Sequence, residues 1–210
     1  EAGVQRGIIE TGMGGRLDAT RLVEADLCIL TTISKEHSEF LGETLAEIAA
    51  EKAAIHRPGV SLIALQHDDS QVRRVIERTA GDDLSWLPSS HTGSTWLSHT
   101  PIVEVAAAHL GWGASTGDCI WPGRSAGYGE DWINGVMTRL SAAHNAESLT
   151  NDFAEVQRPS VVLMGMSQKS DLRATLEPVL AEICKDDKFP QVVLTEPTSG
   201  RNPAVSVEEL

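Results

Sequence analysis

Gly-Ile-Ile-Glu-Thr-Gly-Met-Gly-Gly-Arg-Leu-Asp-Ala-Thr, read from residue 7 to residue 20, is the stretch of sequence that decides the fold. Its first four residues form a short apolar run, which predicts a buried strand. The glycines at positions 12, 14 and 15 follow at once and predict a tight turn. A second apolar run, at residues 27–33, predicts a second strand.

Strands and helices alternate along most of the chain. Residues 43–56 carry apolar side chains at the three-and-four spacing of one helical face, and Pro58 and Gly59 end that helix. A strand at 60–65 and a helix at 69–80 follow. The later part predicts helices at 102–110, 146–156 and 171–184, strands at 160–164 and 191–194, and the start of a helix at 205–210. This alternation predicts an α/β fold of parallel strands joined by crossover helices.

Composition excludes several classes of function. The 210 residues carry a formal net charge of -13, which would repel a nucleic-acid backbone or an anionic membrane surface. The three cysteines are far apart, so neither a disulfide framework nor a thiolate zinc site is expected. No apolar run is long enough for a membrane span, and no signal peptide is recognisable. We therefore expect a cytoplasmic protein with a small-molecule partner.

Three segments resemble the folylpolyglutamate and dihydrofolate synthases of the Mur-ligase superfamily. Residues 9–20 resemble that family's E-x-G-x-G-G-R-L-D-A-T signature, residues 36–42 its D-H-x-x-F-L-G segment, and residues 48–59 its I-A-x-E-K-A-G-I-x-K-P-G segment. The chain departs from the family at Arg21, where the family has Asn, and at Glu36, where it has Asp.

The resemblance implies a division of the chain into three parts. Residues 1–87 would be a partial central domain, a three-layer remnant built on a parallel sheet. Residues 121–210 would be a Rossmann-like C-terminal domain. Residues 88–120, rich in Trp, Gly and His, would be a rebuilt connecting segment.

A metal site is implied by the first half of the resemblance. Glu10 and His37 are similar to magnesium ligands, and Lys52 is similar to a lysine that is carbamylated and supports a second metal. A carboxylate and an imidazole at the carboxyl ends of adjacent parallel strands would in any case converge on the crevice where such sheets bind ligands. The alternatives are a solvated Glu10 and a surface Lys52 paired with Glu47 or Glu51.

The second half of the chain contains two further segments that resemble the family, the second with substitutions. Residues 121–124 resemble W-P-G-R, which implies a phosphate contact for Arg124. Residues 141–148 resemble D-G-A-H-N-P-E-S, but Ser141 and Ala142 replace its Asp and Gly, which predicts a weakened nucleotide contact. The candidate catalytic residues are Glu10, Asp18, His37 and His144, and the candidate substrate-binding residues are Arg16, Arg124, Asn145, Trp96 and Trp112.

No G-x-x-G-K-[ST] phosphate loop occurs in these residues, so ATP binding is not expected, and Mg²⁺ is the one cofactor that the resemblance implies. The leading hypothesis is a shortened homologue repurposed as an ATP-independent tailoring enzyme. It would be an isomerase, cyclase, dehydratase or hydrolase that acts on a small carbonyl or carboxylate natural product by acid–base catalysis.

Two alternatives stay open. One is an ATP-dependent amide ligase that adds glutamate to a folate-like acceptor and takes its phosphate loop from another chain or an omitted segment. The other is a non-catalytic binding scaffold. Because a shortened fold exposes sheet edges, self-association into a homo-oligomer is also expected.

Overall fold

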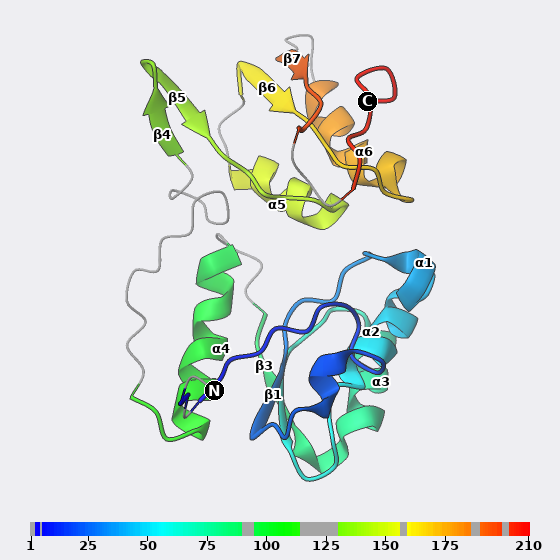
Figure 1. Cartoon of the computed structure of the whole chain (residues 1–210), viewed down its shortest axis with the longest axis vertical. Coiled ribbons are helices and arrows are strands. Elements are labelled where there is room, and N and C mark those ends of the chain that lie inside the picture. The colour runs from blue at the N-terminus through cyan, green and yellow to red at the C-terminus, as the bar shows by residue number, and fades with distance from the viewer. Residues whose placement is uncertain are drawn as a thin grey trace. The chain divides into compact units, whose positions relative to one another are not determined.

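The computed structural model describes residues 3–4, 6–89, 95–113, 130–155, 159–185, 190–198 and 202–210. The chain divides into two compact units. One contains the strands β1 to β3, and the other contains the strands β4 to β7 (Figure 1). The expected division into a central domain, a connecting segment and a C-terminal domain stays a prediction.

A parallel three-stranded sheet forms the centre of the first unit. Its order is β1 (Leu27–Leu30), β2 (Ser61–Leu65) and β3 (Leu84–Leu87). The crossovers contain the helices α1 (Ser38–Leu41), α2 (Leu45–Ala53) and α3 (Ser70–Ala80) and the 3-10 turn η2 (Gly81–Asp83); the turn η1 (Ala19–Leu22) precedes β1, and α4 (Thr95–His109) follows β3. Parallel strands with helical crossovers confirm the α/β fold that the alternation predicted.

Local sequence fixes the ends of the two crossover helices. The Thr44 hydroxyl accepts a hydrogen bond from the Glu47 N–H, and the Glu47 carboxylate accepts one from the Thr44 N–H, so a capping box begins α2. Asp69 caps α3 in a similar way, and Gly81, with a φ of +53°, ends it. These caps fix the residues at which α2 and α3 begin, and so which of their side chains face the core.

The core of the first unit lies between this sheet and these helices. Its fully buried members come from α2, β2 and α3 and include Ile48, Ala49, Leu62, Val72 and Ile76. Each branched side chain buried here contributes about 1.5–3 kcal/mol relative to leaving it exposed. This core anchors the loops that carry the signature residues.

The second unit contains a parallel pair and a hairpin. β6 (Val161–Met164) pairs with β7 (Gln191–Leu194), and α5 (Ala146–Glu155) packs against α6 (Leu172–Ile183). The hairpin joins β4 (Glu130–Ile133) to β5 (Val136–Arg139). Its two turn residues, Asn134 and Gly135, have φ values of +52° and +78°, as a tight two-residue hairpin turn requires.

Some elements differ from the sequence prediction. The predicted strand at residues 7–10 is wrong: the segment is extended but belongs to no strand, and Ile8 and Ile9 are 92% and 54% exposed. An extended segment becomes a strand only when a neighbour completes its hydrogen-bond ladder, and no described strand runs beside this one. The predicted helix start at 205–210 is a turn, and β3 and the hairpin were not predicted.

Within the part of the chain that the structure describes, no helix has both the length and the apolar character to cross a bilayer.

Candidate functional site

Asp18 shapes the glycine-rich turn. Its Oδ2 accepts hydrogen bonds from the N–H groups of Gly12 and Met13, both at 3.0 Å. Its Oδ1 accepts from the Thr20 N–H at 2.8 Å and from the Thr20 hydroxyl at 2.7 Å. These bonds, first among them the one from the Thr20 hydroxyl, lower the pKa of Asp18 from 3.8 to about 2. Asp18 is therefore an ionised cap of the turn, and its predicted catalytic role stays a prediction.

The turn packs against the carboxyl end of α2. The Arg16 N–H donates to the Glu51 carbonyl oxygen at 3.0 Å. A β-carbon built on Gly15 would lie 2.5 Å from the Lys52 carbonyl oxygen, so only glycine fits there. Gly14 makes a similarly close approach to the Leu41 side chain, at 2.9 Å from a β-carbon. The three segments that resemble the family thus meet in space.

Two ion pairs join these segments. The Arg16 Nε donates to the Glu51 carboxylate at 2.8 Å. The Lys52 Nζ donates to the Glu36 carboxylate at 2.5 Å, and both of these side chains are mostly buried. Pairing of Lys52 with Glu47 or Glu51, the surface alternative, is wrong, because Glu47 belongs to the capping box and Glu51 pairs with Arg16. Lys52 instead connects α2 to the loop that follows β1.

Glu10 and His37 both lie on exposed backbone. Glu10 ends the extended segment at 7–10. His37 immediately precedes α1 and has a φ of +50°, a left-handed conformation that costs a non-glycine residue about 1 kcal/mol or more. Strain of this kind is common at functional sites. Among the described residues neither side chain has an ion pair, so both are free to take a ligand.

The metal site at Glu10, His37 and Lys52 stays a prediction. A carboxylate oxygen is the kind of ligand that Mg²⁺ prefers, and an imidazole with water molecules can complete such a shell. Within the described ranges, however, no group of three or more His, Cys, Asp and Glu side chains is arranged to hold a metal ion.

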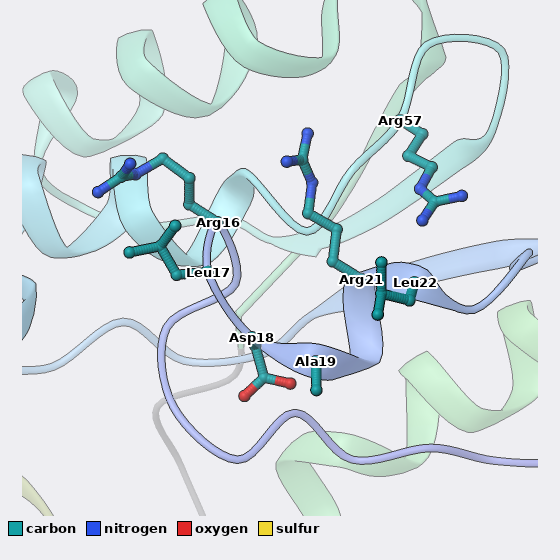
Figure 2. Close-up of a pocket in the computed structure, with 7 residues that line it drawn as sticks. All are labelled: Arg16, Leu17, Asp18, Ala19, Arg21, Leu22 and Arg57. Carbon is teal, nitrogen blue, oxygen red and sulfur yellow. The ribbon is translucent and has the colours of Figure 1, made fainter.

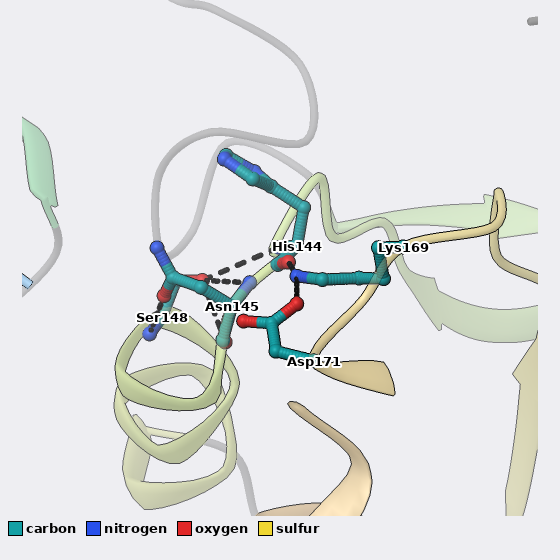
Figure 3. A network of polar contacts seen from close by, with 5 residues as sticks. All are labelled: His144, Asn145, Ser148, Lys169 and Asp171. Atoms are coloured by element: carbon teal, nitrogen blue, oxygen red, sulfur yellow. Dashed lines mark hydrogen bonds and ion pairs between the residues drawn. The ribbon is translucent and has the colours of Figure 1, made fainter. Parts of the chain in front are cut away.

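A polar network in the second unit holds His144 and Asn145 (Figure 3). The Asn145 Oδ1 accepts from the Ser148 N–H at 2.9 Å, so the buried Asn145 caps α5. Lys169 donates to the His144 carbonyl oxygen at 2.8 Å and pairs with Asp171 at 3.0 Å. The His144 ring itself is exposed, and its Nδ1 lies 3.2 Å from the Ala142 carbonyl oxygen.

The remaining predicted residues fall into two groups. Arg124 and the side chain of Trp96 lie outside the described residues. Trp112 is partly buried, and the Arg6 guanidinium lies over its ring, 4.8 Å from the ring centre. That contact gives Trp112 a cation–π partner within the chain. Its predicted substrate-binding role is untested.

A hollow of about 300 Å³ lies beside the glycine-rich turn. Figure 2 shows the residues that line it: Arg16, Leu17, Asp18, Ala19, Arg21, Leu22 and Arg57. Arg16 was predicted as a substrate contact, whereas its neighbours Arg21 and Arg57 were not predicted. The available signal was charge, because three arginines gather here in a chain whose net charge is -13.

No protein-family model matches the sequence. Curated proteins do match part of it. The dihydrofolate synthase/folylpolyglutamate synthase of Haemophilus influenzae is 36% identical over 85 residues, which are 38% of this chain and 20% of that protein. The probable dihydrofolate synthetase of Schizosaccharomyces pombe is 36% identical over 107 residues, 48% of this chain and 26% of that protein. The chain is a relative of the dihydrofolate and folylpolyglutamate synthases.

Solved structures of the same family share the fold. An Escherichia coli FolC in complex with ADP, without folate substrate, gives a TM-score of 0.68 at 22% identity, over 94% of this chain and 54% of that one. A bifunctional folylpolyglutamate synthase/dihydrofolate synthase with Mn, AMPPNP and L-glutamate bound gives 0.69 at 19% identity, over 95% and 54%. This synthase relative therefore spans about half of the solved chains and a fifth to a quarter of the first curated relatives.

These findings correct the functional prediction. The expectation of an ATP-independent tailoring enzyme acting on a natural product is wrong, because the relatives are synthases and the solved neighbours hold ADP or AMPPNP. The ligase alternative agrees better with them. The expectation that ATP is not used conflicts with the same neighbours, and one of them contains a metal, Mn.

Proposed function

We propose that this chain is part of an ATP-dependent amide ligase of the dihydrofolate and folylpolyglutamate synthase type. The enzyme joins the amine of glutamate to the carboxylate of a pteroate-like or folate-like acceptor. The observation that carries the proposal is the docking of the glycine-rich turn on α2 through Gly15 and the Arg16–Glu51 contacts and on Leu41 through Gly14, which gathers three family segments at one place. The phosphate loop comes from a segment or chain outside these 210 residues.

The reaction proceeds in two steps. The acceptor carboxylate attacks the γ-phosphorus of ATP, which forms an acyl phosphate and releases ADP. The amine of glutamate then attacks the acyl carbon, the bond to phosphate breaks, and the nitrogen loses a proton. Both steps concentrate negative charge, so catalysis depends on positive groups and on exclusion of water.

Residues of the first unit would hold and balance that charge. Glu10 and His37 are the groups that would hold a divalent metal, which when bound would neutralise phosphate oxygens. The Lys52 Nζ is held by the Glu36 carboxylate at 2.5 Å, which fixes the side chain that the resemblance associates with a second metal.

His144 is the proposed base for the amine proton. Its Nδ1 lies beside the Ala142 carbonyl oxygen, an arrangement that favours the tautomer with the proton on Nδ1. The lone pair is then on Nε2, in the exposed part of the ring. Lys169 donates to the His144 carbonyl oxygen, and Asn145 caps the helix that follows. These two contacts hold the backbone that carries the imidazole in place.

The exposed segment at residues 7–10 supports a partner for this chain. Ile8 and Ile9 are 92% and 54% exposed, although two adjacent isoleucines in an extended segment are typical of a strand whose two faces are both covered. A phosphate-loop segment that paired with residues 7–10 and packed over both faces would bury them. A second copy of the chain is the other occupant, and sedimentation of the purified chain distinguishes a homo-oligomer from a monomer.

The ligase proposal is tested by ADP release that depends on glutamate and acceptor. The chain is mixed with Mg-ATP, L-glutamate and dihydropteroate, alone and with a separately expressed phosphate-loop segment of the E. coli relative. We expect product in the mixture, and a loss of about 100-fold or more with His144→Ala. Glu43→Gln, an exposed carboxylate beside α2, is the matched control for Glu10→Gln. The proposal would be contradicted if neither mixture gave product, or if the Glu10→Gln and Glu43→Gln variants reacted at equal rates.

A further inference from the structure

One histidine outside the three family segments joins the carboxyl ends of two parallel strands. His67 lies two residues beyond β2, and its Nε2 lies 3.2 Å from the carbonyl oxygen of Ile33, three residues beyond β1. Because β1 and β2 are parallel neighbours, both ends lie at the same edge of the sheet, where sheets of this kind bind ligands. The contact therefore joins two loops whose residues are 34 positions apart in the sequence.

The two partners of the His67 ring determine its tautomer. The Asp69 N–H donates to the His67 Nδ1 at 3.0 Å. A backbone N–H can only donate, so Nδ1 is the acceptor, and the ring proton is on Nε2, from which it donates to the Ile33 carbonyl oxygen. Both ring nitrogens are thus engaged within the chain. The imidazole is therefore not available as a base or as a metal ligand, and its contribution is to hold the two loops together.

The backbone that carries His67 is itself held by neighbouring elements. The Arg73 guanidinium, from α3, donates to the His67 and Asp68 carbonyl oxygens at 2.5 and 2.7 Å. The Gln66 N–H donates at 2.7 Å to the carbonyl oxygen of Leu87, the last residue of β3. A ring that is mounted on a backbone fixed in this way can set the position of a neighbouring loop.

The loop between β1 and α1 is the segment whose position matters. It ends at His37, and a left-handed φ such as its +50° persists only where the surrounding structure holds it. The His67 ring bonds to Ile33 near the start of this loop, and Ile33 is buried in the core. The Lys52–Glu36 ion pair holds the residue immediately before His37. Contacts from two different elements thus act on the loop ahead of the strained residue.

We propose that His67 is a positioning residue, which fixes the loop that carries Glu36 and His37 by donating to the Ile33 carbonyl oxygen. The Asp69 N–H makes this possible, because it holds the ring in the tautomer that has its proton on Nε2. The use of this loop in a ligase reaction rests on the proposed function, whereas the contact that positions it does not. His67 acts on that reaction only through the loop.

Two substitutions separate the two bonds of the ring. The side-chain oxygen of asparagine lies near the place of Nδ1, and the side-chain nitrogen of glutamine lies near the place of Nε2. His67→Asn therefore keeps an acceptor for the Asp69 N–H and loses the donor to Ile33. His67→Gln keeps the donor to Ile33 and loses the acceptor for Asp69. Circular dichroism checks that each variant of the 210-residue chain is folded.

Amide hydrogen exchange reads both bonds. The N–H groups of Phe40 and Leu41 report on the loop, because both donate to the His37 carbonyl oxygen at 2.9 Å. We expect His67→Asn to accelerate their exchange roughly threefold to tenfold and to leave the Asp69 N–H protected. His67→Gln should do the reverse. A general effect on stability would instead accelerate both sets of amides in both variants.

His109→Gln is the matched control, because His109 is an exposed histidine at the end of α4, and it should change neither set of amides. Heteronuclear NMR of the unaltered chain should show His67 protonated on Nε2 alone. The proposal is overturned by a proton on Nδ1, or by Phe40 and Leu41 amides that exchange equally fast in the two His67 variants. Neither measurement uses ATP, glutamate or an acceptor, so the outcome is independent of the ligase assay, and either can fail alone.

Discussion

Replacing Gly15 with alanine would place a methyl group against the backbone of α2. The added carbon would lie 2.5 Å from the Lys52 carbonyl oxygen and 2.9 Å from both the Glu51 carbonyl oxygen and the Ile55 nitrogen, where ordinary contacts begin at 3.4 Å. All three atoms belong to the backbone, so none can rotate away. The turn must move by roughly half an ångström or more, which breaks or stretches the 3.0 Å hydrogen bond from the Arg16 N–H to Glu51.

The magnitude follows from two terms. Overpacking of this kind costs about 1–3 kcal/mol, and the loss of one hydrogen bond costs about 0.5–1.5 kcal/mol. We expect Gly15→Ala to lower the free energy of unfolding of the first unit by about 2–4 kcal/mol, which lowers its Tm by roughly 5–12 °C for a chain of this size. Hydrogen exchange at the Arg16 amide should accelerate in parallel.

Thermal unfolding and amide exchange of the variant give the answer, with Gly113→Ala as control. Gly113 has an ordinary φ, and a β-carbon there meets no atom of the described residues within 4 Å, so its replacement should change Tm by less than about 2 °C. If Gly15→Ala is as stable as Gly113→Ala, and the Arg16 amide stays protected, the turn does not dock on α2 and the reasoning about the gathered segments fails.

Three further measurements test side-chain contacts of the first unit. A double-mutant cycle of Lys52→Met and Glu36→Gln should show a coupling of about 1 kcal/mol in urea unfolding, because the two side chains are only 19% and 24% exposed; coupling near zero would mean that the pair does not form. Asp18 has a pKa of about 2 in the folded chain against 3.8 ordinarily, so the stability that it contributes is present above pH 3.8 and is lost as the pH falls toward 2; an NMR titration of its carboxyl group with a midpoint near 3.8 would refute this. Asp83→Asn should cost about 1–2 kcal/mol, because the Asp83 carboxylate accepts from the Gly59 N–H at 2.8 Å and contacts the buried His56 ring at 3.2 Å; the exposed Asp82→Asn is the control, and equal stabilities would contradict the assigned contact.

The sequence predicted the crossover elements well because each carries its own local signals. The three-and-four spacing of apolar side chains in α2 is visible within a few residues, so it could be recognised without a structure, whereas the Thr44 and Asp69 caps were found only in the structure. The strand expected at residues 7–10 failed for the opposite reason. Its apolar composition is right for a strand, but pairing needs a neighbour, and no periodicity within four residues reveals whether one exists.

The candidate site was predictable residue by residue but not as an arrangement. The resemblance identified Glu10, His37 and Lys52, yet spacing gave no hint that Lys52 would pair with Glu36, 16 residues earlier. Arg21 and Arg57 were missed because they are 36 positions apart, and what joins them is the course of the turn beside the loop that follows α2. Long-range contacts of this kind follow from packing, which a single sequence records only indirectly.

The position of Asp18 bears on how an inherited motif should be weighed. All four bonds that its carboxylate accepts come from the loop in which it sits, so mutation would damage the loop whether or not any reaction took place beside it. A descendant that had lost its chemistry would still be under pressure to retain this aspartate. The presence of this aspartate therefore shows that the loop needs it, and does not show that the chain catalyses a reaction. Evidence for catalysis has to come from residues such as His144, whose exposed ring contributes less to the fold.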